Sequence, residues 1–251
     1  VETEIAGVAC HIIPGLSAFV GGDITAGILA SGMLEQEAST LLIDLGTNGE
    51  MALGNRHRLH ACATAAGPAF EGGANRGIWG ADMVRLLQKL LEEGLMDGQG
   101  LLKEPYFTKG VRIGDVLVTK ESVRAVQLAK GAIAAGIEIL ADSYGIRFSD
   151  ISKVVLAGGF GYYLDPKAAV AIGLLPEELA DCTVTGGNTA LSGAAMVGSR
   201  ILTAGGKQTA EGTLPDGGDA LRKRQELQIR ILNLAEEEKF PETFLTKINF
   251  N

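Results

Sequence analysis

Three strand-like segments along the chain each end in a glycine-rich turn, and this feature constrains the fold more than any other. The segments cover residues 41–45, 154–157 and 182–185, and they precede Gly46, the pair Gly158 and Gly159, and the pair Gly186 and Gly187. Short apolar runs bounded by turn residues predict buried strands. Glycine allows the backbone to turn sharply and to approach another group closely. We therefore expect three strand ends that converge on one ligand.

The remaining patterns indicate an α/β protein. Apolar residues recur at helical spacing over residues 82–93 and 121–141. Further helices are expected over 16–30, 166–172, 189–202 and 221–238, and further strands over 7–14, 50–55, 57–64 and 116–118. Residues 204–218 have the composition of a loop. The apolar residues 240–250 are expected to pack on the body of the protein.

Charge and cysteine content exclude several classes of function. The net charge of −8 lacks the basic character of a nucleic-acid-binding protein. No apolar run approaches the ~18–20 residues that a membrane span needs. The three cysteines, Cys10, Cys62 and Cys182, are too widely spaced for a metal knuckle or a disulfide framework. A reducing, cytoplasmic location is the simpler interpretation.

Residues 43–50 (Ile-Asp-Leu-Gly-Thr-Asn-Gly-Glu) carry the first candidate site. A buried strand delivers Asp44 at its end, and Gly46 and Gly49 allow a turn whose backbone N–H groups form an anion-binding concavity. Asp44 would act on a phosphate through Mg²⁺ or a water molecule, since Mg²⁺ is shared between carboxylates and substrate phosphates. The alternative is a plain hairpin turn, which Asn-Gly strongly favours.

The other two turns have similar alternatives. Gly158 and Gly159 would let a flat purine or ribose lie against the backbone, or they form a tight strand–helix turn. The segment after Gly187 carries small residues that let a helix pack closely on another helix, or simply within a core. The chain has neither the P-loop sequence nor the Rossmann fingerprint.

The order of these motifs resembles the second half of the actin, sugar-kinase and heat-shock-chaperone ATPase superfamily. Residues 21–27 resemble its first connecting helix, 42–49 its second phosphate loop, 127–130 a ribose-contacting helix, 156–160 its adenosine motif and 187–194 its second connecting helix. The resemblance implies an RNase H-like lobe of the actin-like ATPase fold, a mixed sheet flanked by helices. The first phosphate loop expected before Gly21 is missing, so we expect the first lobe to be largely absent.

The resemblance also implies a division of the chain into three parts. Residues 1–40 would be the connecting strand and helix from the truncated first lobe. Residues 41–203 would be the nucleotide-binding lobe, with a helical insertion at 68–145. Residues 204–251 would be a linker, a C-terminal helix and a packed tail.

Three segments resemble one family more closely, the C-terminal domain of reductive activators of corrinoid proteins. They are residues 44–50, residues 65–72 (Ala-Ala-Gly-Pro-Ala-Phe-Glu-Gly) and residues 126–133 (Val-Gln-Leu-Ala-Lys-Gly-Ala-Ile). This resemblance implies that ATP is used to return a cobalt(II) corrinoid protein of a methyltransferase system to cobalt(I). A two-iron ferredoxin-type cluster would belong to a separate N-terminal domain, because three cysteines cannot supply its four ligands.

The resemblance also implies roles for individual residues. Asp44 and Glu71 would be catalytic, and Asp44 and Asp23 would hold a metal ion. The nucleotide would be bound by Gly46, Thr47, Asn48, Gly49, Gln127, Lys130, Gly158, Gly159, Phe160 and Asn188. The alternatives are a helix-start carboxylate for Glu71, a helix surface charge for Asp23 and a solvated helix residue for Lys130. Glu50 is as well explained by a surface strand as by function.

Two other classes of function stay open at this point. One is a small-molecule kinase-type phosphotransferase, although no acid–base residue accompanies a substrate-binding signature. The other is a non-catalytic nucleotide-binding or interaction module, and the apolar residues 240–250 leave a homodimer open. With the first lobe absent, we do not expect this chain to hydrolyse ATP by itself.

Overall fold

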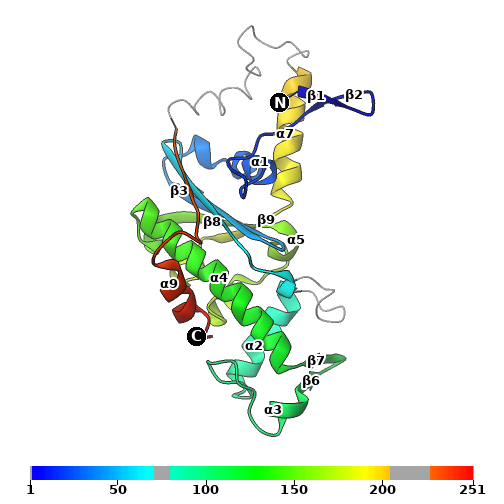
Figure 1. Ribbon diagram of the computed structural model, residues 1–251, viewed down its shortest axis with the longest axis vertical. Helices are drawn as coiled ribbons and strands as arrows, with labels where there is room; N and C mark the ends of the chain where they lie inside the picture. The colour runs from blue at the N-terminus through cyan, green and yellow to red at the C-terminus, as the bar shows by residue number, and fades with distance from the viewer. Residues whose placement is uncertain (1, 71–79, 204–226, 251) are drawn as a thin grey trace.

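A mixed six-stranded sheet forms the centre of the molecule, with strand order β10-β5-β4-β3-β8-β9 (Figure 1). The computed structural model describes residues 2–70, 80–203 and 227–250. The strands of the sheet are β3 (Ser39–Leu45), β4 (Gly49–Gly54), β5 (Arg58–Thr64), β8 (Ile151–Ala157), β9 (Thr183–Gly187) and β10 (Gln228–Leu232). Strands β3, β4 and β5 form an antiparallel meander. Strand β8 runs parallel to both β3 and β9, and β10 runs parallel to β5.

Helices cover both faces of this sheet (Figure 1). On one face lie α1 (Gly22–Ser31) and α7 (Thr189–Thr203), and on the other lie α4 (Lys120–Tyr144) and α9 (Phe240–Lys247). The alternation of β3 explains the two layers, because successive side chains of a strand point to opposite faces. Leu41 and Ile43 belong to the core under α4, whereas Leu42 belongs to the core under α1.

Helix α4 is the longest element, and its sequence accounts for both ends. Thr119 caps its first turn, where the Thr119 and Ser122 side chains bond reciprocally to backbone N–H groups. Gly145 ends it in the left-handed conformation. Its apolar stripe, which includes Val126 and Ile133, is fully buried.

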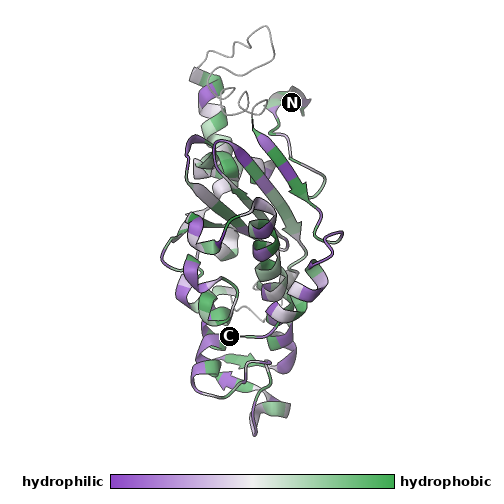
Figure 2. Ribbon diagram, turned by 90° about the vertical axis from the view of Figure 1, so that its left-hand side faces the viewer, coloured by the Kyte–Doolittle hydropathy of each residue, from purple (hydrophilic) through white to green (hydrophobic). Residues whose placement is uncertain are grey.

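The segment between β5 and α4 extends the molecule beyond the sheet (Figure 1). It contains α2 (Gly80–Glu92), α3 (Tyr106–Lys109) and the hairpin of β6 (Val111–Ile113) and β7 (Val116–Val118). Helix α2 buries Met83 and Leu87 while its charged residues face outward. Figure 2 shows hydrophobic and hydrophilic residues interleaved along the elements, as expected for amphipathic elements that bury one face.

Several shorter elements complete the fold. The hairpin of β1 (Glu2–Ile5) and β2 (Val8–His11) forms a separate two-stranded sheet near the end of α7 (Figure 1). Short helices cover α5 (Gly158–Gly161), α6 (Pro166–Ala171) and the 3₁₀ turns Met33–Glu35, Pro68–Phe70, Phe148–Asp150 and Glu177–Leu179. None of the described helices is long and apolar enough to cross a bilayer.

The predicted strands and most predicted helices are found, but the helix expected over residues 221–238 is wrong where the structure describes it. Residues 228–232 form β10, which pairs with β5 at the edge of the sheet. Ladder hydrogen bonds to β5 outweigh the helix propensity of a charged segment. Residues 233–238 form turns and not a helix, whereas residues 221–226, like the loop at 204–218, lie outside the described residues.

The C-terminal residues pack on the body, as expected. Ile248 and Phe250 are buried, and the N–H of Phe250 donates to the carbonyl of Gly98 at 2.8 Å. Leu245, in the same segment, is 65% exposed, and the homodimer that the sequence left open stays a prediction.

Candidate functional site

The three glycine-rich turns lie at one edge of the sheet. Strands β3, β8 and β9 are mutually parallel neighbours, so their carboxyl ends point the same way (Figure 1). Asp44 pairs with Ala157, and Ala157 pairs with Gly187. Neighbouring strands are about 4.8 Å apart. The residues that the sequence separates by more than 140 positions therefore share one small surface, as predicted.

Asp44 is half-buried on the face of the sheet that α1 covers, because it alternates with Leu42 along β3. Glu50 on β4 stands directly opposite Asp44, and directly opposed like charges repel each other. Asp23, in the first turn of α1, adds a third negative charge nearby. Burial raises the pKa of Asp44, and the charge of Asp23 raises it further. Burial, then Asp23, then Asp44 raise the pKa of Glu50 to about 7.

Asp44 and Glu50 suit a hard cation that is bound by oxygen. Burial first, and then the charges of neighbouring carboxylates, raise the pKa values of these two residues, and a cation would relieve the repulsion. Within the described residues, no group of three or more His, Cys, Asp or Glu side chains is close enough to hold a metal ion alone. That arrangement fits Mg²⁺, which binds through one or two carboxylates and takes its other ligands from water and phosphate.

The turn between β3 and β4 is a short hairpin, so the plain structural interpretation of Asn-Gly is correct for the backbone. The N–H of Gly46 donates to the carbonyl of Asn48 at 3.0 Å, and the carbonyl of Thr47 accepts from Gly67 at 2.9 Å. Gly46, Thr47 and Asn48 are exposed, whereas Gly49 is buried. The two backbone hydrogen bonds therefore hold the turn in place, and its exposed residues 46–48 are accessible to a ligand.

Gly158 lies against Asp44, and only glycine fits at this position. Its φ of +84° is left-handed, and a Cβ there would lie 2.5 Å from Oδ1 of Asp44 and 2.6 Å from the carbonyl oxygen of Leu45. Gly159 has a different environment, since a Cβ there would meet nothing within 4 Å. The open side of Gly159 is available to a ligand.

We expect Gly158→Ala to destabilise this chain by about 1–3 kcal/mol, because it adds both left-handed strain and a steric overlap. The matched control is Gly159→Ala, which should leave stability within about 0.5 kcal/mol of the wild type. Urea denaturation of the two variants measures the difference. Equal midpoints for both would show that the backbone at Gly158 relaxes without displacing Asp44.

The structure does not present the side chain of Phe160 to a ligand. Its ring stacks on Phe70, with centroids 4.2 Å apart and planes within 4°, and Phe160 is 8% exposed. Asn188 also has a structural role, since its Oδ1 accepts from the N–H of Leu191 at 2.8 Å and caps α7. Both residues lie at the predicted edge of the sheet, but these contacts already use their side chains.

Gln127 and Lys130 are not brought to the strand ends. They lie on α4, which covers the opposite face from α1, and both are buried. Nε2 of Gln127 donates to the carbonyl of Gln99 at 2.8 Å, and Nζ of Lys130 donates to the carbonyl of Asn249. The ribose-binding expectation is not supported by these contacts. A solvated Lys130 is wrong as well, because the residue is 1% exposed.

The burial of Lys130 predicts a pH dependence. Burial and then the positive charge of Lys247 lower the pKa of Lys130 from 10.5 to about 8. Between these two values the unfolded chain binds more protons than the folded chain, so the free energy of unfolding rises with pH over this window. We expect Lys130→Met to remove the rise, whereas the control Lys153→Met, at an exposed position on β8, keeps it. Urea denaturation from pH 7.5 to 10.5 measures both, and parallel curves for wild type and Lys130→Met would contradict the prediction.

Two predicted residues remain, Glu71 and Asp23. Glu71 lies outside the described residues. Asp23 is exposed, and its Oδ1 accepts from the N–H of Ile24 at 2.9 Å. Its charge acts on both Asp44 and Glu50, so it lies near the strand ends, and its metal-binding role stays a prediction.

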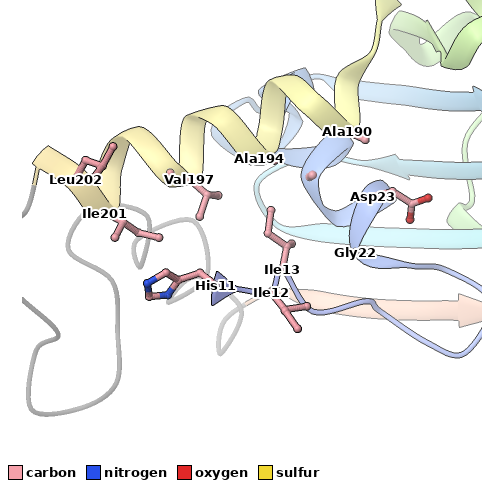
Figure 3. Close-up of a pocket in the computed structure, with 12 residues that line it drawn as sticks. His11, Ile12, Ile13, Gly22, Asp23, Ala190, Ala194, Val197, Ile201 and Leu202 are labelled. Carbon is pink, nitrogen blue, oxygen red and sulfur yellow. The ribbon is translucent and has the colours of Figure 1, made fainter. Parts of the chain in front are cut away.

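An apolar groove of about 780 Å³ begins at Asp23 and runs along α7 (Figure 3). Ile13 and His11 border it on one side, and Ala194 and Ile201 of α7 border it on the other. None of the strand-end glycines lines this groove. Its apolar walls do not suit phosphate.

Sequence reasoning missed two features of the site. The sequence pattern does not distinguish a functional Glu50 from an ordinary surface residue of a strand. The spacing of Asp44 and Glu50 around a two-glycine hairpin is the signal that would have placed the two side chains opposite each other. Tyr162 and Tyr163 were not considered, although they directly follow the glycine turn and are 53% and 61% exposed. A run of aromatic residues beside a predicted ligand-binding turn is the signal that would have found them.

A mixed six-stranded sheet flanked by helices on both faces is the architecture of an actin-like (ASKHA) domain. Residues 38–76 and 74–204 match the family described as the C-terminal domain of RACo, the ASKHA domain. This match spans more than half of the chain, and the chain belongs to that family.

Similar proteins carry related names. The corrinoid activation enzyme RamQ of Eubacterium limosum is 35% identical over 222 residues, which covers 66% of this chain and 37% of that protein. The [Co(II) methylated amine-specific corrinoid protein] reductase of Methanosarcina barkeri is 27% identical over 235 residues, or 73% of this chain and 43% of that protein. A solved reductive activator for corrinoid, iron-sulfur protein has a TM-score of 0.80 and 27% identity, covering 96% of this chain and 44% of that one. The chain thus spans less than half the length of each.

Proposed function

We propose that this chain is the ATP-binding lobe of a reductive activator that returns a cobalt(II) corrinoid protein to cobalt(I) for methyl transfer. The observation that carries the proposal is the convergence of Asp44, Glu50 and three glycine turns at one edge of the sheet. Membership of the RACo C-terminal family supports the choice of reaction. The names of the similar proteins support a corrinoid protein as the partner.

The residues of the site suggest how ATP would be handled. Bound Mg²⁺ would neutralise phosphate charge, and Asp44, with Asp23 and Glu50 nearby, would hold it. The exposed turn at residues 46–48 would lie against the phosphate oxygens. Asp44 would also orient the attacking water, because its carboxylate is fixed at the end of a buried strand. Glu71 stays a candidate for the same task.

Electrons would come from elsewhere in the full-length protein. The chain contains three cysteines, and Cys62 is fully buried with its pKa raised to about 12, mainly by burial. A buried thiol of this kind is unreactive and does not ligate a cluster. The two-iron cluster would lie in a separate domain, and ATP-driven closure of the two lobes would change the conformation of the bound corrinoid protein.

The test compares ATP turnover by this chain and by the full-length protein, each with and without a cobalt(II) corrinoid protein. The proposal expects turnover only by the full-length protein, stimulated by the corrinoid protein, with cobalt(I) appearing when a reductant is present. Stimulation by a small alcohol or acid instead would indicate the phosphotransferase. No nucleotide binding by the full-length protein would leave a non-catalytic module.

A further inference from the structure

Two exposed tyrosines stand beside the glycine turns of the candidate nucleotide site. Tyr162 and Tyr163 follow α5, the short helix that begins at Gly158 and contacts the ends of β3 and β9. They are 53% and 61% exposed, which is unusual for large rings next to a buried strand end. The N–H of Tyr162 donates to the carbonyl of Gly158 at 3.2 Å, so the position of its backbone is set by the turn itself.

The Cδ2–Cε2 edge of the Tyr162 ring lies beside the third glycine turn. A Cβ on Gly187 would be 3.6 Å and 3.9 Å from Cδ2 and Cε2 of Tyr162. Tyr163 packs against Tyr162 in a T-shaped pair, with centroids 4.8 Å apart and planes at 87°. The carbonyl of Tyr163 accepts a hydrogen bond from Arg85 at 3.5 Å. Tyr163 is therefore a positioning residue that limits where the Tyr162 ring can turn.

The spacing along the sheet edge suits an extended nucleotide. Asp44, on β3, and Gly187, on β9, are separated by two strand spacings, or about 10 Å. The acidic residues and the exposed turn at 46–48 occupy one end of this edge, and the Tyr162 ring occupies the other. Between them lie Gly158 and the open side of Gly159. Phosphates would lie at the first end and an aromatic base at the second.

We infer that the ring of Tyr162 stacks on the nucleobase of the bound nucleotide, an inference that rests on the proposed function. Phe160, the aromatic residue that the sequence favoured, is stacked on Phe70 and has no free face to offer. An aromatic ring next to a glycine surface holds a flat base by its π-face, and this contact tolerates any base. The ring contributes binding energy without touching the phosphates.

The experiment measures binding of Mg·ATP and of Mg·tripolyphosphate, which lacks a base, to the full-length protein by calorimetry. We expect Tyr162→Ala to weaken ATP binding roughly five- to 150-fold, the range that corresponds to loss of one base–aromatic stack. Tripolyphosphate binding should not change. Tyr162→Phe, which keeps the ring, should bind ATP within about threefold of the wild type. The matched control is Phe107→Ala, at an exposed aromatic residue on α3, which should change the binding of neither ATP nor tripolyphosphate.

The outcomes separate the inference from the proposed function. If the wild type binds ATP and Tyr162→Ala binds it equally well, the inference is overturned and the proposed function stands. Equal weakening of ATP and tripolyphosphate would also overturn it, because the substitution would then act on the fold of the turn. If the wild type binds neither ligand, the proposed function fails, and the inference fails with it.

Discussion

We expect Asp44→Asn in the full-length protein to lower ATP turnover by a factor on the order of 10²–10³ or more and to leave the fold intact. The factor is that for removing one electrostatic contact to the transition state. Asparagine keeps the shape of the side chain but removes the charge that would hold Mg²⁺ and orient water. Initial-rate measurements of phosphate release, with the corrinoid protein present, test this expectation.

The same substitution should raise stability, which distinguishes a functional loss from a folding defect. The folded chain holds Asp44 half-buried, opposite Glu50 and near Asp23, and its pKa is raised by burial and by Asp23. Removing this charge relieves repulsion in the folded state, and it removes one cause of the raised pKa of Glu50. The control is Asp115→Asn, at an exposed position between β6 and β7, which should change neither ATP turnover nor the free energy of unfolding. Unchanged turnover in Asp44→Asn would remove Asp44 from the mechanism.

Gly193→Ala should destabilise this chain by about 3 kcal/mol, the upper end of the range for overpacking. A Cβ on Gly193 would overlap the carbonyl group and the Cα atom of Ala26, so α7 could not keep its contact with α1. Backbone atoms cannot rotate away as the end of a side chain can. The two helices would have to separate, and Asp23, at the start of α1, would move with them.

Gly198→Ala is the matched control, because Gly198 lies on the same helix and a Cβ there would meet nothing within 4 Å. Alanine in the interior of a helix is favoured over glycine, so this variant should gain about 0.5–1 kcal/mol. Urea denaturation of this chain measures opposite shifts for the two variants. Equal stabilisation of both would show that α1 and α7 are not packed as closely as described.

Local patterns predicted the elements that carry the site. The apolar run before Gly46 is β3, the run before Gly158 is β8, and both end where the sequence placed them. The pattern could not predict that residues 228–232 form a strand, because their partner β5 lies more than 160 positions earlier in the chain. A segment without strong periodicity takes the conformation that its distant partner stabilises.

Burial by distant segments explains the other differences. Gln127 and Lys130 were correctly placed on a helix, but residues 98–100 and the C-terminal residues cover that side of α4. Phe160 was correctly placed after a strand, but Phe70 occupies the face of its ring. Spacing along a helix says which residues share a face, and it does not say what lies against that face.

The sequence by itself determined the α/β class, the glycine turns and the position of Asp44 at a strand end, since these follow from interactions between near neighbours in the chain. Only the tertiary structure decided that Asp44 faces Glu50 and lies near Asp23, that Lys130 is buried and that the ring of Tyr162 lies beside Gly187. Each of these depends on strand register or on helix packing, which join residues far apart in the chain. The raised pKa values arise from the same cause, because burial and charge proximity exist only once the sheet and its helices have assembled.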